Sequence, residues 1–350
     1  MNSFAVAAQR RSVIRHLYSL ILNCIVEPIS IHSRRCKSIA CLAITVASTP
    51  LVAGSATGAS VDPLQTAEGR IDQTVLKGVV KITSSPKKLE ETTIGTGFFV
   101  SQEIQEGTRA VYLVTNKHVV SDWDVSDGSI THYSTKITVF FYRISDSGGT
   151  TYRSLTIDLV DASGRLLTNK VAVHPNRSID VAIVRLDREL DPANKIDLLS
   201  FDRSFLIPFN NTVNWAGLGT QVFALGYPLG ISSLINNYPI AKAGYVSSIA
   251  GQEFKIEIPV QNRAGRSVVA KIEDKFVVVD GLIVPGNSGG PVVIPAETRV
   301  RTDPVTNQFQ FTKEPTKNLV IGMVSMGLGG SGLTLVLSSD YIIELLDKLK

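Results

Sequence analysis

The segment 284–291, Val-Pro-Gly-Asn-Ser-Gly-Gly-Pro, constrains this chain more than any other. Apolar runs precede it at 276–279 and follow it from 291, so it reads as a tight turn between two strands. Glycine permits backbone angles and close approaches that a side chain would prevent. The hydroxyl of Ser288 and the backbone N–H groups of Gly286 and Ser288 can therefore converge, as a nucleophile and an oxyanion hole do in acyl transfer. An ordinary glycine-rich hairpin is the alternative.

Residues 286–290 also fit G-x-S-x-G, the nucleophile elbow of α/β-hydrolases. In that fold the catalytic histidine follows the serine. All histidines of this chain precede Ser288; they are His16, His32, His118, His132 and His174. The α/β-hydrolase hypothesis is therefore excluded, and the order His, Asp, Ser remains open.

Two further segments supply that order. The apolar run 111–114 leads to His118, and 95–100 reads as the hairpin partner of this strand. Asp180 opens the apolar run 180–186. A histidine can act as general base for a serine when an acid orients its ring. The alternative is that His118 caps a strand and Asp180 is a turn residue.

Together these segments resemble the trypsin-like serine proteases, and most closely the bacterial HtrA/Deg proteases. Residues 115–120 resemble the histidine motif of that family, 180–186 its aspartate motif, and 286–291 its serine motif. Residues 321–327 resemble the strand that binds substrate backbone. The similarity runs from about residue 79 to the C-terminus, and it implies a chymotrypsin-like, all-β fold of two six-stranded antiparallel β-barrels with a C-terminal α-helix.

The resemblance also implies the roles of the site residues. Ser288 would be the nucleophile, His118 the base and Asp180 its orienting acid, with the N–H groups of Gly286 and Ser288 as the oxyanion hole. Trypsin-like zymogens have an acid beside the serine that pairs with a new N-terminus, and here Asn287 stands there. Activation by N-terminal cleavage is therefore not expected.

Four residues receive substrate-binding roles from the same resemblance. Ser325 and Gly327 would pair with the substrate backbone by strand addition. Leu282 would form the floor of the primary specificity pocket, and Gly327 and Gly332 its walls. An apolar floor predicts cleavage after small or aliphatic residues, because an unpaired buried charge is costly. If Asp280 forms the floor instead, basic residues would be preferred.

The pattern of short apolar runs separated by turn residues indicates an all-β barrel or sandwich, with no helical stretches that would suggest βαβ units. We expect an N-terminal barrel at 76–210, with the histidine and the aspartate, and a C-terminal barrel at 211–350, with the serine. The segment 341–350 has an apolar helical face, and Ser338 and Ser339 before it suit a helix start. No PDZ domain is expected after this helix.

Residues 1–56 have the pattern of a leader. The basic sequence at 34–37 precedes an apolar run at 38–52, and small residues at 53–56 suit cleavage. The long stretch before them indicates an extended n-region or a later start codon. An uncleaved anchor is the alternative, although the run is short for a span of about 20 residues. We expect an exported protein, periplasmic or secreted, with a polar linker at 57–75.

The leader accounts for the charge and the cysteines. The chain carries a net charge of +4, but beyond residue 56 there are 29 basic and 30 acidic residues, so no nucleic-acid surface is expected. All three cysteines, Cys24, Cys36 and Cys41, lie in the leader, so the mature protein needs no disulfide. No motif indicates a metal or another cofactor. The expected partners are polypeptide substrates, with membrane contact only through an uncleaved leader.

Two functions remain. The first is an exported serine endopeptidase, and the second is a protease-fold protein that binds or chaperones with weak or no hydrolysis. The complete set of site residues favours the first, and a fluorophosphonate label on Ser288 would discriminate between them.

Overall fold

The computed structural model describes residues 71, 73–85, 92–144, 150–186, 199–232, 237–249, 252–262, 264–281, 283–295, 299–302, 309–312, 318–328 and 330–349. All of them belong to one compact unit, Val61–Lys350. The expected leader at 1–56, most of the linker and Leu282 lie outside the described residues. None of the helices in these ranges is long and apolar enough to cross a membrane.

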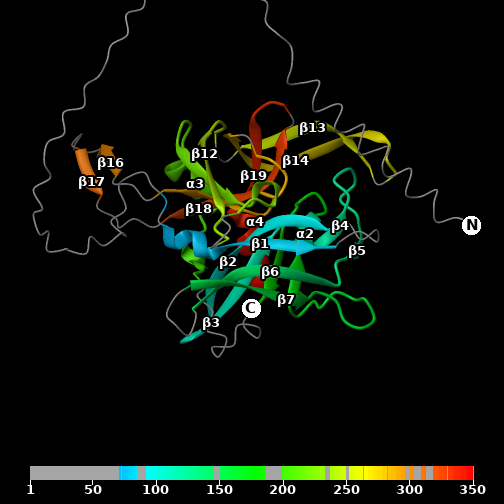
Figure 1. Ribbon diagram of the computed structural model, residues 1–350. Helices are drawn as coiled ribbons and strands as arrows, with labels where there is room; N and C mark the ends of the chain where they lie inside the picture. Colours follow the sequence, from blue (N-terminus) through cyan, green and yellow to red (C-terminus); the bar gives the residue numbers. More distant parts are fainter. Residues whose placement is uncertain are drawn as a thin grey trace, which may run out of the picture. The chain divides into compact units, whose positions relative to one another are not determined.

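The first sheet has the order β7-β6-β1-β2-β3-β9-β8, with β10 paired in parallel to β2. The other neighbours in this order pair antiparallel. Strands β1, β2, β3, β6 and β7 of this sheet are labelled in Figure 1. An antiparallel bridge between Val160 and Leu166 folds the segment that connects β7 to β8 back on itself. The strands are β1 (Val79–Ser84), β2 (Thr93–Gln105), β3 (Thr108–Thr115), β6 (Lys136–Ile144), β7 (Thr150–Asp158), β8 (Val171–Val173), β9 (Ala182–Arg185) and β10 (Phe201–Asp202).

The second sheet has the order β12-β11-β15-β18-β19-β14-β13. An additional pairing between β12 and β14 closes six of these strands into a ring and leaves β13 outside it, as the partner of the long strand β14. The strands are β11 (Gln221–Gly226), β12 (Ile240–Val246), β13 (Glu253–Gln261), β14 (Ser267–Asp280), β15 (Pro291–Ile294), β18 (Leu319–Leu328) and β19 (Leu333–Ser338).

The expected all-β fold, with two barrels and a C-terminal helix, is confirmed. The second barrel is the expected ring of six strands. The first sheet has eight strands rather than six in the described residues, because two short strands add to it. β8, with three residues, lies at one end of the order, and β10, with two, pairs with β2 beyond the part of β2 that β1 covers.

Strands β2 and β3 contribute to two apolar cores at once. Neighbouring side chains of a strand point to opposite faces. Phe99 and Leu113 pack inside the first barrel, whereas Phe98 and Tyr112 pack in a cluster that also contains Tyr227 of the second half. This burial on both faces explains why these strands have continuous apolar runs rather than alternating ones.

The C-terminal helix α4 (Ser339–Lys348) begins two residues earlier than predicted. The hydroxyl of its N-cap, Ser338, accepts the N–H of Asp340. The apolar face buries Ile342, Leu345 and Leu346 completely. Tyr112 Oη of the first sheet donates to Leu349 O at 3.0 Å, so the end of the chain is bonded to the N-terminal barrel.

The sequence did not predict several short elements. Most have seven residues or fewer, too short for a periodic pattern to be recognised. They are the 3₁₀ turns η1 (Gln73–Gly78), η3 (Arg203–Phe205) and η4 (Pro228–Gly230), the helices α2 (Lys117–Val120) and α3 (Phe209–Trp215), and the strands β4 (Ser121–Trp123), β5 (Ile130–Tyr133), β16 (Arg299–Thr302) and β17 (Phe309–Thr312).

Candidate active site

His118 lies on a helical turn, and not at the end of a strand as the sequence suggested. Strand β3 ends at Thr115, and His118 is the second residue of the one-turn helix α2. The first N–H groups of a helix have no partner within it. The side chain of Asp180 supplies one, because its Oδ1 accepts the backbone N–H of His118 at 3.1 Å.

The same carboxylate holds the ring of His118. Nδ1 of His118 and Oδ2 of Asp180 are 2.6 Å apart. Asp180 is 1% exposed, and Asn116 Nδ2 donates to its backbone carbonyl at 2.6 Å. A carboxylate only accepts hydrogen bonds, so Nδ1 carries the proton and Nε2 of the neutral ring keeps its lone pair. The ring therefore has the tautomer that a general base requires.

The environment of His118 changes its pKa in opposing ways. Burial lowers the pKa, while the charge of Asp180 and the hydrogen bond to it raise the pKa. The two effects of Asp180 together outweigh burial, so the pKa of His118 lies above its ordinary value of 6.5. The side chain is 32% exposed, which leaves one face of the ring open to the cleft. Asp180 therefore stabilises the protonated ring that would form after a proton transfer.

The turn that carries Ser288 requires its glycines. A Cβ at Gly286 (φ +98°) would lie 2.3 Å from the carbonyl oxygen of Tyr227, and one at Gly289 (φ +86°) would lie 2.2 Å from that of Thr96. No Cβ can approach an oxygen so closely, and positive φ favours glycine as well. The turn is thus packed against both halves of the protein, unlike an exposed ordinary hairpin.

A hydrogen bond behind this turn orients the N–H of Gly286. The carbonyl of Pro285 accepts the N–H of Leu229, in η4, at 2.7 Å. Because the peptide between Pro285 and Gly286 is planar and trans, its N–H points away from its carbonyl. The Gly286 N–H is therefore directed away from Leu229, as an oxyanion donor on the cleft side would be.

Most of the predicted site residues line one cleft of about 500 Å³. His118, Asp180, Ser288, Ser325 and Gly327 all line it. No hydrogen bond joins Ser288 to His118 among the residues that the structure describes. Catalytic hydrogen bonds are often long without substrate and tighten when it binds, so the shared cleft is the relevant observation.

Ser325 occupies a β-bulge. The register of β18 against β19 shifts between Val324 and Met326, so Ser325 is the extra residue. Bulges are common beside active sites, where they redirect the chain. The pairing of β18 with β15 extends only to Met323, so within the described ranges β18 from Ser325 to its end pairs only with β19. This open edge could accept an added strand.

The two glycines assigned to the pocket wall differ in their positions. A Cβ at Gly327 would lie 3.1 Å from the carbonyl oxygen of Ile283, so this glycine keeps the cleft open. Gly332 is not among the described residues that line the cleft, and a Cβ there would lie 4.0 Å from Oδ1 of Asp280. The predicted floor residue, Leu282, lies outside the described residues.

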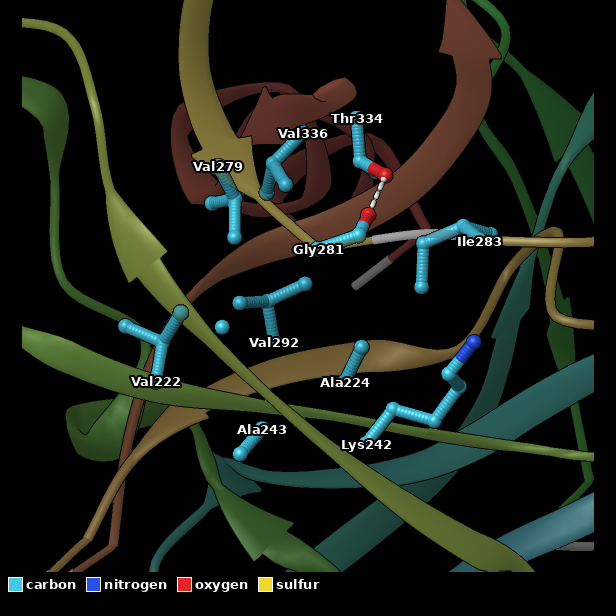
Figure 2. Close-up of a pocket in the computed structure, with 11 residues that line it drawn as sticks. Val222, Ala224, Lys242, Ala243, Val279, Gly281, Ile283, Val292, Thr334 and Val336 are labelled. Atoms are coloured by element: carbon cyan, nitrogen blue, oxygen red, sulfur yellow. Dashed lines mark hydrogen bonds between the residues drawn. The ribbon is translucent and has the colours of Figure 1, made fainter. Parts of the chain in front are cut away.

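The neighbours of Leu282 are held at the mouth of the second barrel. Thr334 Oγ1 donates to the carbonyl oxygen of Gly281 at 2.6 Å, as Figure 2 shows. Ile283 lines both the cleft and a small cavity inside this barrel, which has room for about one water molecule. Lys242 lines the same cavity on the side where Ile283 lies (Figure 2). Gly281 and Ile283, on either side of Leu282 in the sequence, thus line a mainly apolar cavity to which Thr334 and Lys242 also contribute.

Two features of the cleft were not predicted from the sequence. Trp123 lines it, its ring centroid lies 6.5 Å from that of His118, and its Nε1 donates to Arg177 O. A groove of about 590 Å³ continues from the cleft and shares Gly327 with it; β13 contributes Ile256 and Ile258 to its lining. The apolar alternation of β13 was visible, but its position beside the cleft was not.

No group of three or more His, Cys, Asp or Glu is arranged to hold a metal ion in the part of the chain that the structure describes.

Residues 95–300 match the family model described as "Trypsin-like peptidase domain", which is more than half of the chain. Among solved structures, the active form of the Rv3671c protease from M. tuberculosis is 19% identical, with 79% of this chain and 82% of that chain covered and a TM-score of 0.43. HBP is 14% identical, with 81% and 94% covered and a TM-score of 0.40. A comparison with curated proteins found no match.

Proposed function

Because the chain belongs to the trypsin-like peptidase domain family, we propose that it is a serine endopeptidase that hydrolyses peptide bonds through an acyl-enzyme. One observation carries the proposal. Ser288 lines the same cleft as His118, whose Nδ1 lies 2.6 Å from the carboxylate of Asp180. A nucleophile, a base and an orienting acid in one cleft make up the machinery of acyl transfer.

In the first half of the reaction, Ser288 Oγ attacks the carbonyl carbon of the scissile bond and Nε2 of His118 accepts the hydroxyl proton. Asp180 stabilises the imidazolium, in agreement with the raised pKa of His118. The tetrahedral intermediate expels the amine, which takes that proton from Nε2. In the second half, a water molecule attacks the ester, His118 again accepts and returns one proton, and Ser288 is regenerated.

The backbone would stabilise the negative oxygen of each intermediate. We assign this role to the N–H groups of Gly286 and Ser288. The bond from Leu229 N to Pro285 O supports the assignment, because it directs the Gly286 N–H away from η4. In other serine proteases the loss of one such donor costs about 10²–10³ in kcat.

The substrate would bind as an added strand. We place its backbone along β18, with Ser325 O accepting an N–H of the residue before the scissile bond and Gly327 pairing further along. The open edge of β18 and the bulge at Ser325 support this placement. Apolar substrate side chains upstream would meet the groove that β13 lines with Ile256 and Ile258.

We propose cleavage after small or aliphatic residues. Ile283 and Gly327 line the cleft. Leu282 and Gly332 are assigned to the floor and the wall from the sequence. An apolar floor offers no partner for a buried charge. Mapping cuts in a peptide library by mass spectrometry tests this preference. Dominant cleavage after Lys or Arg would point to Asp280 as the floor.

We also propose that the protein acts outside the cytoplasm, after removal of residues 1–56. The basic segment 34–37, the apolar run 38–52 and the small residues that follow support it. Intact-mass analysis of exported protein tests it. An N-terminus within a few residues of Thr57 is expected, and a mass that includes Cys36 and Cys41 would contradict it.

Active-site labelling tests the function itself. We expect a fluorophosphonate to label wild-type protein on Ser288, and Ser288→Ala to lose both labelling and casein hydrolysis while its melting temperature stays near that of wild type. His118→Ala should be about as inactive as Ser288→Ala, and the double variant should be little worse, because the triad acts as a unit. Folded wild-type protein that neither labels nor cleaves would favour the binding or chaperone alternative.

A further inference from the structure

Thr96, in β2, makes four hydrogen bonds with its three polar groups, and three of these bonds reach segments of the second barrel. Its N–H donates to Ser288 O at 2.9 Å, and its hydroxyl donates to Gly286 O at 2.6 Å. The hydroxyl also accepts the N–H of Tyr227 at 3.1 Å. Its carbonyl oxygen accepts the hydroxyl of Thr115 at 2.8 Å. Thr96 is fully buried, so these bonds do not compete with solvent.

Two of these bonds hold the peptides on either side of the Ser288 N–H. That N–H belongs to the peptide between Asn287 and Ser288. The preceding peptide is fixed through Gly286 O by the hydroxyl of Thr96, and the following peptide through Ser288 O by its N–H. The carbonyl of the peptide between them, Asn287 O, accepts the N–H of Gly290 at 2.9 Å, and because this peptide is planar and trans, the Ser288 N–H points the opposite way.

We propose that Thr96 is a positioning residue whose hydroxyl holds the turn around Ser288 in the conformation that can bind an oxyanion. The proposal rests on the proposed peptidase function, because it concerns the same site. Thr96 touches neither the substrate nor the reacting atoms, and it acts through the Gly286 carbonyl.

The space around the hydroxyl is adapted to it. A Cβ at Gly226 would lie 2.9 Å from Thr96 Oγ1 and 2.7 Å from Oδ1 of Asn287. The glycine therefore leaves room for the hydroxyl beside the turn. A single hydroxyl both donates to Gly286 O and accepts from Tyr227 N, which serine could also do and which valine and alanine could not.

The same residue is connected to the histidine segment. Thr115 is the last residue of β3 and stands three positions before His118. The hydroxyl of Thr115 donates to Thr96 O. Thr96 is therefore hydrogen-bonded both to the strand end that leads to His118 and to the turn that carries Ser288. Thr96 thus contributes to the relative position of the base and the nucleophile, which come from different barrels.

The test compares Thr96→Val and Thr96→Ala, which lack the hydroxyl, with Thr96→Ser, which keeps it. Thr83→Val is the matched control, because Thr83 lies in β1 of the same sheet and pairs with β2 and β6 rather than with the serine turn. We would measure kcat and KM on one peptide, the rate of fluorophosphonate labelling, and the melting temperature. Substrate affinity would be measured after adding Ser288→Ala to each variant.

We expect Thr96→Val and Thr96→Ala to lower kcat and the labelling rate by about tenfold or more, with substrate affinity within about twofold of wild type, because a misdirected oxyanion donor affects the transition state more than the ground state. Thr96→Ser and Thr83→Val should stay within about threefold in kcat.

If Thr96→Val fails to fold, the comparison of alanine with serine decides. Equal losses in serine and in the hydroxyl-free variants, a kcat near wild type without the hydroxyl, or a parallel loss of substrate affinity would each overturn the proposal. An inactive, unlabelled wild-type protein would instead reject the peptidase function, and this proposal with it.

Discussion

Asp180 binds His118 twice, through Nδ1 at 2.6 Å and through the backbone N–H at 3.1 Å. One carboxylate therefore fixes both the ring and the helical turn that carries it. This arrangement couples the geometry of the base to its charge, because the carboxylate that orients the ring also favours its protonated form.

The pH dependence of catalysis should reflect that coupling. The charge and hydrogen bond of Asp180 outweigh burial and raise the pKa of His118 above 6.5. A general base must be neutral, so kcat/KM should rise with pH and reach its half-maximum above pH 6.5. The interaction stabilises the fold at acid pH, and this contribution is lost as the pH rises through the folded pKa.

A pH–rate profile of wild type and Asp180→Asn measures the effect. In Asp180→Asn the acid limb should move to lower pH, and kcat should fall by up to about 10⁴-fold, since the amide can favour the wrong tautomer. An acid limb that is the same in both proteins would contradict the role of Asp180.

Gly327→Val should narrow the cleft. A Cβ at this position already lies 3.1 Å from Ile283 O, and the two further methyl groups would reach into the cleft. We expect kcat/KM for peptides with Leu or Met before the scissile bond to fall by about tenfold or more, and for Ala by less. Gly217→Val is the control, because a Cβ at Gly217 would have no atom within 4 Å. It should leave kcat/KM unchanged for both kinds of peptide. Equal losses for all peptides would indicate general damage.

Lys117 should make stability depend on pH in the alkaline range. It is buried, donates to Asn176 O at 2.8 Å, and burial lowers its pKa from 10.5 to about 8 despite the charge of Asp180. Below pH 8 the charged side chain costs the fold about 3 kcal/mol relative to the unfolded chain. Between pH 8 and 10.5 the folded protein has lost this proton while the unfolded chain still holds it, so the cost shrinks as the pH rises. Above about pH 10.5 both states are neutral and the cost is gone.

Urea unfolding of Lys117→Met against wild type tests this sign. The variant should be more stable at pH 7, and its advantage should shrink steadily between pH 8 and 10.5. A constant difference at all pH values would show that the charge of Lys117 is not the cause.

Leu345→Ala should destabilise the whole unit. Leu345 is fully buried on α4, which contacts β8 and β9 of the first barrel as well as β18 and β19 of the second. Removing its side chain should cost about 2–5 kcal/mol, measured as a lower urea midpoint. Lys348→Ala, on the exposed face of the helix, should stay within about 0.5 kcal/mol. A small effect of Leu345→Ala would mean that α4 is not part of the cooperative unit.

The strands that carry the predicted site could be found from sequence because each coincides with a continuous apolar run beside a recognisable motif. Strand β3 and strand β15 were expected near their observed positions, and the serine turn between β14 and β15 was recognised from its glycines. The one-turn helix at His118 was not expected, because four residues show no period and Asp180, which satisfies its N–H, is 62 residues away.

The sequence by itself determined the all-β class, the C-terminal helix and the order of His118, Asp180 and Ser288, since these depend on local pattern and on succession along the chain. Only the tertiary structure decided that Thr96 bonds the serine turn, that Trp123 lies beside His118, and that β13 extends the cleft. These contacts join residues from different strands and loops, many of them far apart in sequence. No local sequence pattern predicts such contacts. Each partner alone is an ordinary polar or apolar residue, and the packing of the two barrels determines which residue lies next to it.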